Sequence, residues 1–259
     1  MHTILSKDGT KIAYDKVGRG PTLIVVLGAL NARKSGANLA KLLASDYTVI
    51  NYDRRGRGDS SNTLPYAPER EIEDLAALID EVGAPVYLYG HSSGAAIGLE
   101  VAAKMPEQIK KLAIYEVPYV ATDDERKAAE LYNKQLKKLL ASDNVEGAVS
   151  LFLTHVGVSE KQIAALKRMP MWKGLVAMAP TLAYDSDVLG VGHSLPTTLL
   201  ADIATPTLVM HGGKGAAPMR NVAIAISKII PKVRLHTVEG QDHGVSPKVL
   251  APILSNYFK

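Results

Sequence analysis

The chain has 259 residues, of which 47% are hydrophobic and 22% charged, a balance typical of a globular protein and not of a disordered one. The formal charge of +4 comes from 30 Lys and Arg residues that are scattered along the sequence. Basic runs interleaved with aromatic residues are missing, so nucleic acid is not an expected partner. The sequence contains no cysteine, which excludes disulfides, thiolate catalysis and cysteine-ligated metals.

The first residues, MHTILSKDGTKIAY, lack the apolar segment of a signal peptide. No apolar run reaches the roughly 18 residues that a transmembrane helix needs. We therefore expect a cytoplasmic protein without a membrane partner, either a monomer or a homodimer.

Strand and helix signals alternate along most of the chain. A hairpin is expected over residues 3–16, where Asp8-Gly9 supplies the turn. Six apolar runs typical of buried parallel strands follow, at residues 22–27, 47–52, 86–89, 111–115, 206–210 and 233–238. Segments with helical periodicity lie between or after them, at residues 39–43, 68–82, 95–104, 219–230 and 247–257.

Strand signals stop between residues 120 and 195. This part is predicted to hold helices at residues 123–141, 145–155, 160–168 and 171–179. An alternating strand and helix pattern interrupted by one all-helical block predicts an α/β fold with a mostly parallel sheet and a helical insertion. We expect a core formed by residues 1–118 and 197–259, with the insertion at residues 119–196.

One stretch carries a clear chemical signal. Residues 85–98, PVYLYGHSSGAAIG, read as a strand, then G-x-S-x-G, then a helix of small residues. This context indicates a nucleophile elbow, in which Ser92 sits on a sharp turn with its hydroxyl exposed. Gly90 and Gly94 have no Cβ, so the strand can turn into the helix without a clash.

The pattern resembles the α/β-hydrolase fold superfamily. The resemblance is carried by Gly28-Ala29 after the third strand, YDRRGRGDS at residues 52–60, GHSSG at 90–94 and EGQDH at 239–243. It covers the chain outside the insertion, where only the helical character matches. It implies an eight-stranded, mostly parallel sheet flanked by helices, an inserted helical cap, and a serine hydrolase that needs no cofactor and no metal.

The resemblance also implies that His243, between the last strand and the last helix, is the base that activates Ser92. The usual place of the third triad residue is the turn after strand 206–210, but residues 211–218, HGGKGAAP, contain no carboxylate. Some members, haloalkane dehalogenases among them, carry the acid after the sixth strand, where this chain has Glu116. Asp242, beside His243, is the weaker alternative, and the choice between the two stays open here.

The expected oxyanion donors are the backbone N–H groups of Ser93 and Ala29. A substrate pocket for an acyl or alkyl group is expected among the residues Leu30, His91, Met171, Trp172 and Met178. The methionines and the tryptophan would equally suit the core of the insertion. The arginines of residues 53–60 are expected to form internal salt bridges and not an anion site.

The predicted function is hydrolysis of a small, apolar carboxylic ester or lactone through an acyl-enzyme and a Ser-His-Glu triad. Hydrolysis of a thioester or a C–C bond by the same residues is an alternative. The missing acid after Met210 also keeps a non-catalytic binder of a small ligand in consideration.

Overall fold

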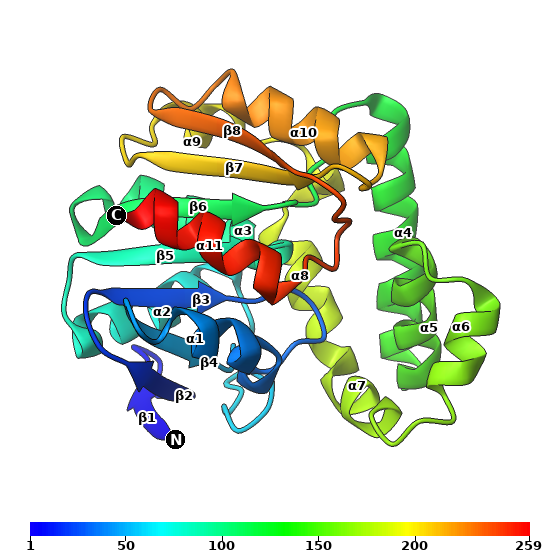
Figure 1. Cartoon of the computed structure of the whole chain (residues 1–259). Coiled ribbons are helices and arrows are strands. Elements are labelled where there is room, and N and C mark those ends of the chain that lie inside the picture. The colour runs from blue at the N-terminus through cyan, green and yellow to red at the C-terminus, as the bar shows by residue number, and fades with distance from the viewer.

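The computed structural model describes all 259 residues and is built on one eight-stranded sheet (Figure 1). The strand order is β1-β2-β4-β3-β5-β6-β7-β8. β1 and β2 form an antiparallel hairpin, β2 also pairs antiparallel with β4, and every other pair is parallel. The strands are β1 (His2–Leu5), β2 (Lys11–Gly18), β3 (Thr22–Val26), β4 (Thr48–Tyr52), β5 (Val86–His91), β6 (Ile109–Tyr115), β7 (Thr207–Gly212) and β8 (Val233–Val238). The predicted fold class is therefore confirmed.

Helices cover both faces of the sheet because its central strands are apolar on both sides. α1 (Ala37–Leu43) and α11 (Pro247–Phe258) pack on one face (Figure 1). The other face is covered by α2 (Pro68–Val82), α3 (Ser93–Lys104), α9 (Thr197–Ala201) and α10 (Ala217–Ser227). Alternate residues of one strand serve the two cores: in β5, Leu88 packs with the α2 and α3 side and Tyr89 with the α1 and α11 side.

Only helices lie between β6 and α9. They are α4 (Asp123–Ala141), α5 (Val145–His155), α6 (Glu160–Leu166), α7 (Trp172–Met178) and α8 (Leu182–Val188), with 3₁₀ turns at Ala179–Thr181 and Val191–His193. α4 to α7 stand at the end of the sheet toward which β3, β5 and β6 point (Figure 1). Their apolar faces form a third cluster of buried side chains, separate from the two cores on the sheet.

The end of this helical region differs from the prediction. The helix expected over residues 171–179 agrees with α7 to within one residue at each end, but a 3₁₀ turn that contains Pro180 then leads into a further helix, α8. A proline has no N–H to donate and its ring crowds the preceding turn, and Pro180 lies in the 3₁₀ turn where the regular helix is interrupted. α8 itself has no periodic apolar stripe in the sequence and was not predicted.

No helix of the protein combines the length and the apolar character that crossing a membrane requires.

A substitution in the central strand β5 measures how much of the stability comes from the core of the sheet. Leu88 is fully buried between β5 and its covering helices, so Leu88→Ala should lower the free energy of unfolding by about 2–5 kcal/mol through lost burial and a cavity. Leu235 on the outer strand β8 is 42% exposed, and Leu235→Ala should change it by less than about 0.5 kcal/mol. Urea unfolding of the two variants beside the wild type measures both values. Equal losses would contradict this description of the core.

Candidate functional site

Ser92 lies at the junction between β5 and α3, at the carboxyl edge of the sheet. Its backbone has φ 55° and ψ −130°, a conformation that residues other than glycine rarely adopt. The turn is held because the Ser92 N–H donates to the Tyr115 carbonyl at 3.0 Å and the Ala95 N–H to the Ser92 carbonyl at 2.8 Å. The flanking glycines are required: a Cβ at Gly90 would lie 2.6 Å from Ala95 Cα, and one at Gly94 would collide with the Val26 carbonyl. The strained turn leaves the Ser92 side chain partly exposed.

Glu116 and His243 are brought together, although 127 positions separate them in the sequence. His243 Nδ1 lies 2.8 Å from Glu116 Oε2, and the other carboxylate oxygen accepts the Gly212 N–H at 2.9 Å. Burial by itself would raise the pKa of Glu116, but the hydrogen bonds from His243 and Gly212 outweigh it and hold the pKa below its ordinary value. The carboxylate is thus charged and fixed beside the ring, while His243 Nε2 has no protein partner.

The other carboxylate considered from the sequence points elsewhere. Asp242 Oδ1 accepts the Gly244 N–H at 2.9 Å, a local turn contact on its own loop. Gly215 lies where the more usual acid was expected, and a Cβ there would be only 2.5 Å from Glu116 Oε1. The Glu116 carboxylate therefore occupies the space that a side chain at position 215 would need.

His91 contacts the backbone of the loop that carries His243. Its Nε2 donates to the His243 carbonyl at 2.9 Å, and the two ring centroids are 5.0 Å apart. Burial, together with the neighbouring His243, lowers the pKa of His91 to about 4. His91 is therefore neutral at neutral pH and holds the loop in place, a role that nothing in the sequence marked.

The loop after β3 lies directly against Ser92. A Cβ at Gly28 would be 2.7 Å from Ser92 Cβ and 3.2 Å from Ser92 Oγ, so only glycine fits here. The next N–H belongs to Ala29, and on the other side of Ser92 the N–H of Ser93 is the first of α3. Neither N–H donates to a protein acceptor. Both are free beside the hydroxyl, and the positive end of α3 adds to their attraction for an anion.

The arginines of the segment after β4 are buried and paired. Arg54 forms a double hydrogen bond with Glu71, and Arg55 forms another with Asp74. Arg57 pairs with Asp185, which comes from α8 in the helical insertion. Burial by itself would raise the pKa of Asp185, but Arg57 and Arg54 outweigh it and keep the pKa below its ordinary value. Asp185 was not predicted, because the two arginines that pair with it lie more than 120 residues away in the sequence.

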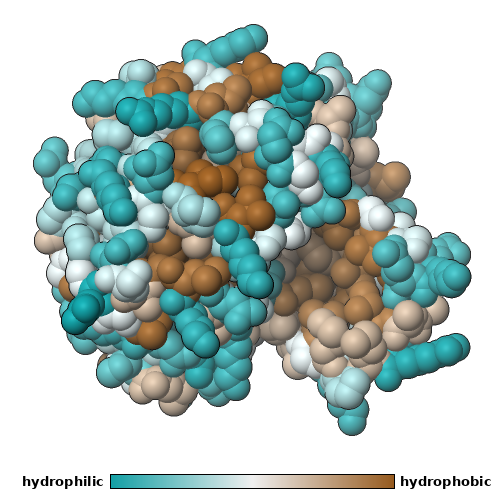
Figure 2. Space-filling model, viewed as in Figure 1, coloured by the Kyte–Doolittle hydropathy of each residue, from teal (hydrophilic) through white to brown (hydrophobic).

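The residues predicted to line a pocket do not all meet. Leu30 and Trp172 are both buried in the apolar cluster of the insertion, and Met178 packs against it. Met171 is 52% exposed and lies outside this cluster. A space-filling view shows a hollow between the core and the insertion, with hydrophobic side chains on its walls (Figure 2). Such walls suit an apolar ligand.

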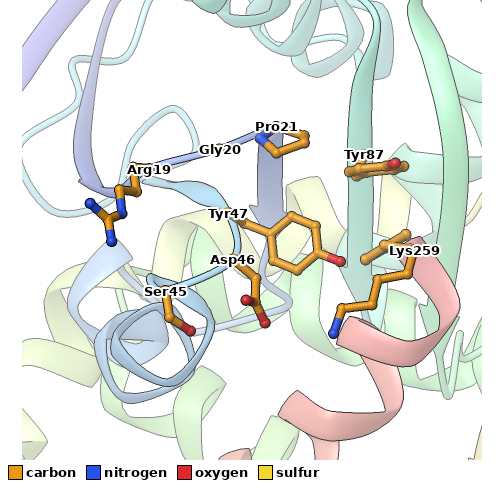
Figure 3. Close-up of a pocket in the computed structure, with 9 residues that line it drawn as sticks. Arg19, Gly20, Pro21, Ser45, Asp46, Tyr47, Tyr87 and Lys259 are labelled. Atoms are coloured by element: carbon orange, nitrogen blue, oxygen red, sulfur yellow. The ribbon is translucent and has the colours of Figure 1, made fainter.

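A second depression lies at the opposite end of the sheet. It has a volume of about 500 Å³ and is bordered by the residues that precede β3 and β4 and by the end of α11, with Tyr47, Tyr87 and Lys259 among its walls (Figure 3). None of the predicted site residues borders it. This depression is therefore separate from the candidate site at Ser92.

Comparisons with known proteins give the family. Residues 30–252 match the model of the "Alpha/beta hydrolase family". The structure of an alpha/beta hydrolase from Sphaerobacter thermophilus DSM 20745 is 44% identical, covers 100% of both chains and superposes with a TM-score of 0.91. The 2-(acetamidomethylene)succinate hydrolase of Mesorhizobium japonicum is 25% identical over 93% of this chain and 88% of its own.

A third relative, the uncharacterized hydrolase YraK of Bacillus subtilis, is 34% identical over 140 residues, which is 52% of this chain and 52% of YraK. The family match covers most of the chain, and the names of these relatives agree with it. The chain belongs to the alpha/beta hydrolase family.

Proposed function

We propose that the protein hydrolyses small, apolar carboxylic esters, lactones included, through an acyl-enzyme formed on Ser92. One observation carries the proposal: His243 Nδ1 is held by the buried carboxylate of Glu116 at 2.8 Å, which leaves Nε2 as the free nitrogen. An imidazole oriented in this way acts as a base and its protonated form is stabilised by the carboxylate. Ser92, on its strained turn, is the nucleophile that this base would activate.

The reaction proceeds in two stages. Ser92 Oγ attacks the ester carbonyl while His243 Nε2 takes its proton, and the carbonyl oxygen becomes an oxyanion that accepts from the N–H groups of Ala29 and Ser93. His243 then gives the proton to the leaving alcohol, and the acyl group stays on Ser92. Water, deprotonated by His243, attacks the acyl-enzyme in the same way, and the carboxylic acid is released.

The helical region of residues 119–196 acts in this proposal as a cap over the carboxyl edge. The hydrophobic side chains on the walls of the hollow between this region and the core would hold the acyl or alkyl part of the ester (Figure 2). The 2-(acetamidomethylene)succinate of one relative is a dicarboxylate. Arg54, Arg55 and Arg57 already pair with buried carboxylates, so none of the three is free to hold such a substrate. The apolar walls and the paired arginines favour an uncharged ester over that substrate.

Thioester and C–C bond hydrolysis need the same three side chains and remain alternatives for the bond that is cleaved. A series of p-nitrophenyl esters of increasing acyl length, run beside a panel of lactones, thioesters and β-diketones with a cleavable C–C bond, separates them. We expect the ratio kcat/KM to be highest for esters or lactones with an apolar acyl part. Turnover of none of these substrates would favour the non-catalytic binder.

Ser92→Ala removes the nucleophile without changing the charge of the site. We expect kcat for the best ester to fall by about 10⁶, to the level set by binding and the oxyanion donors alone. Ser45→Ala, at an exposed serine of the opposite depression, is the matched control and should retain the wild-type rate. If Ser92→Ala retains more than a few per cent of the wild-type rate, another residue is the nucleophile.

Glu116→Gln tests the acid. A glutamine keeps the size of the side chain but neither orients His243 by charge nor stabilises its protonated form, so kcat should fall by about 10⁴. Asp242→Asn should leave kcat within about threefold of the wild type, because its carboxylate contacts only its own loop. The opposite ranking of the two variants would identify Asp242 as the acid.

A relocated carboxylate gives a stricter version of this test. Glu116→Ala frees the space that its carboxylate fills beside Gly215. Adding Gly215→Asp to Glu116→Ala should then restore part of the lost activity, whereas Gly215→Asp alone should be disruptive because Glu116 is in its way. No gain in the double variant would argue against an acid at this edge of the sheet.

The pH dependence of kcat/KM should show that a single histidine takes part in ester hydrolysis. Glu116 is ionised because its pKa is lowered, and His91, with its pKa of about 4, is already neutral from about pH 5 upward. The base must be unprotonated, so log kcat/KM should fall with a slope of about 1 as the pH decreases through a single histidine ionisation. A pH titration of ester hydrolysis measures the slope. A slope near 2 in this range would mean that a second histidine takes part.

A further inference from the structure

A buried ionic cluster joins the helical insertion to the core and contacts Ser93, the residue after Ser92. Its members are Arg54 and Arg57 after β4, Glu71 in α2 and Asp185 in α8, all of them buried. Arg54 is held by both oxygens of Glu71, at 2.9 and 2.7 Å. One oxygen of Asp185 accepts a hydrogen bond from Arg54 Nη1 at 2.8 Å, and the other accepts one from Arg57 Nη2 at 2.9 Å. Asp185 is the only carboxylate that Arg57 contacts.

The two arginines also hold the loop after β3. Arg57 Nη1 donates to the Gly28 carbonyl at 3.2 Å, and Arg54 Nη1 donates to the Leu27 carbonyl at the same distance. The Gly28 carbonyl and the Ala29 N–H belong to one trans peptide, so they point in opposite directions. A cation bound to the carbonyl therefore fixes the direction of the N–H. It also polarises the peptide, which makes the N–H a better donor.

The second oxyanion donor is tied to the same carboxylate. The Ser93 hydroxyl donates to Asp185 Oδ1 at 2.6 Å, and Arg54 Nη1 lies 3.2 Å from the Ser93 oxygen. Ser93 is the first residue of α3, so anchoring its side chain also anchors its backbone N–H. One carboxylate thus contacts Ser93 directly and reaches the Ala29 peptide through Arg57.

We propose that Asp185 is a positioning residue of the oxyanion hole, holding the N–H groups of Ala29 and Ser93 in register from within the helical insertion. This rests on the proposed function, in which those two groups stabilise the oxyanion. It also assigns a second role to the insertion, which would set the geometry of catalysis in addition to lining the pocket. Within the cluster, two arginines balance two carboxylates, so loss of the Asp185 charge leaves Arg57 unpaired against the Gly28 carbonyl.

The test compares Asp185→Asn with Asp74→Asn. Asp74 is equally buried and pairs with Arg55 at 2.7 and 2.8 Å, but it contacts neither Ser93 nor the loop after β3. Both variants disturb a buried ion pair, and thermal unfolding reports how much stability each loses. Kinetics with the best ester then give kcat and KM. Inhibition by a trifluoromethyl ketone, which forms an oxyanion on the nucleophilic serine, measures the donors directly.

In Asp185→Asn we expect kcat to fall by about 10- to 100-fold, somewhat less than the loss of one complete oxyanion donor, with KM within about threefold of the wild type. Trifluoromethyl ketone binding should weaken by the same factor as kcat/KM. Asp74→Asn should keep kcat within about threefold. A wild-type kcat in Asp185→Asn, or equal losses in the two variants, would overturn the proposal.

Failure of the proposed function gives a different result. If the wild type shows no Ser92-dependent turnover, the ester mechanism is wrong, and positioning is judged by nuclear magnetic resonance alone. The amide resonances of Ala29 and Ser93 should then shift in Asp185→Asn and stay in place in Asp74→Asn. Unmoved resonances in Asp185→Asn would overturn the positioning role whatever the reaction is.

Discussion

The contact between Glu116 and His243 is the interaction on which the account of this hydrolase depends. It is possible because β6 and β7 are neighbours in the sheet and β8 lies beside β7, so the residues that follow these strands gather at one edge. Glu116 has a left-handed backbone, φ 45°, which turns the chain as it leaves β6. Its buried carboxylate is satisfied on one oxygen by Gly212 at the end of β7 and on the other by His243. The Glu116 carboxylate, which follows β6, thus fills the space that a side chain at position 215 on the loop after β7 would need.

The residues around Ser92 tolerate little change in size or charge. Gly28, Gly90 and Gly94 each lie where a Cβ would meet backbone or the side chain of Ser92. Behind them, the arginines after β4 are each paired with a buried carboxylate, so none of the three is a free cation. Burying such groups is costly unless every charge is compensated. The compensation comes from α2 in the core and from α8 in the insertion, which makes the two parts of the chain interdependent.

The sequence predicted the parts that depend on local pattern. The strands of the sheet, the elbow at Ser92 and helices α4 and α5 follow from periodicity and from G-x-S-x-G between a strand and a helix. The position of Glu116 is less direct: residues 211–218 contain no carboxylate, and Glu116 after the sixth strand is the other position for an acid that the resemblance implies. α8 and its Asp185 were not predicted, because the ion pairs that give them a role join residues that are distant in sequence and leave no periodic signal. The contact of His91 with the His243 carbonyl is missed for the same reason.

The central claim is that Ser92 is a nucleophile activated by His243, and covalent labelling tests it without knowledge of the substrate. The protein would be treated with a fluorophosphonate and the adduct located by peptide mass spectrometry, in the wild type and in His243→Ala. The account predicts a single adduct on Ser92 that forms rapidly in the wild type and is nearly absent in His243→Ala. An unlabelled wild type, an adduct on another serine, or equal labelling of the two proteins would contradict it.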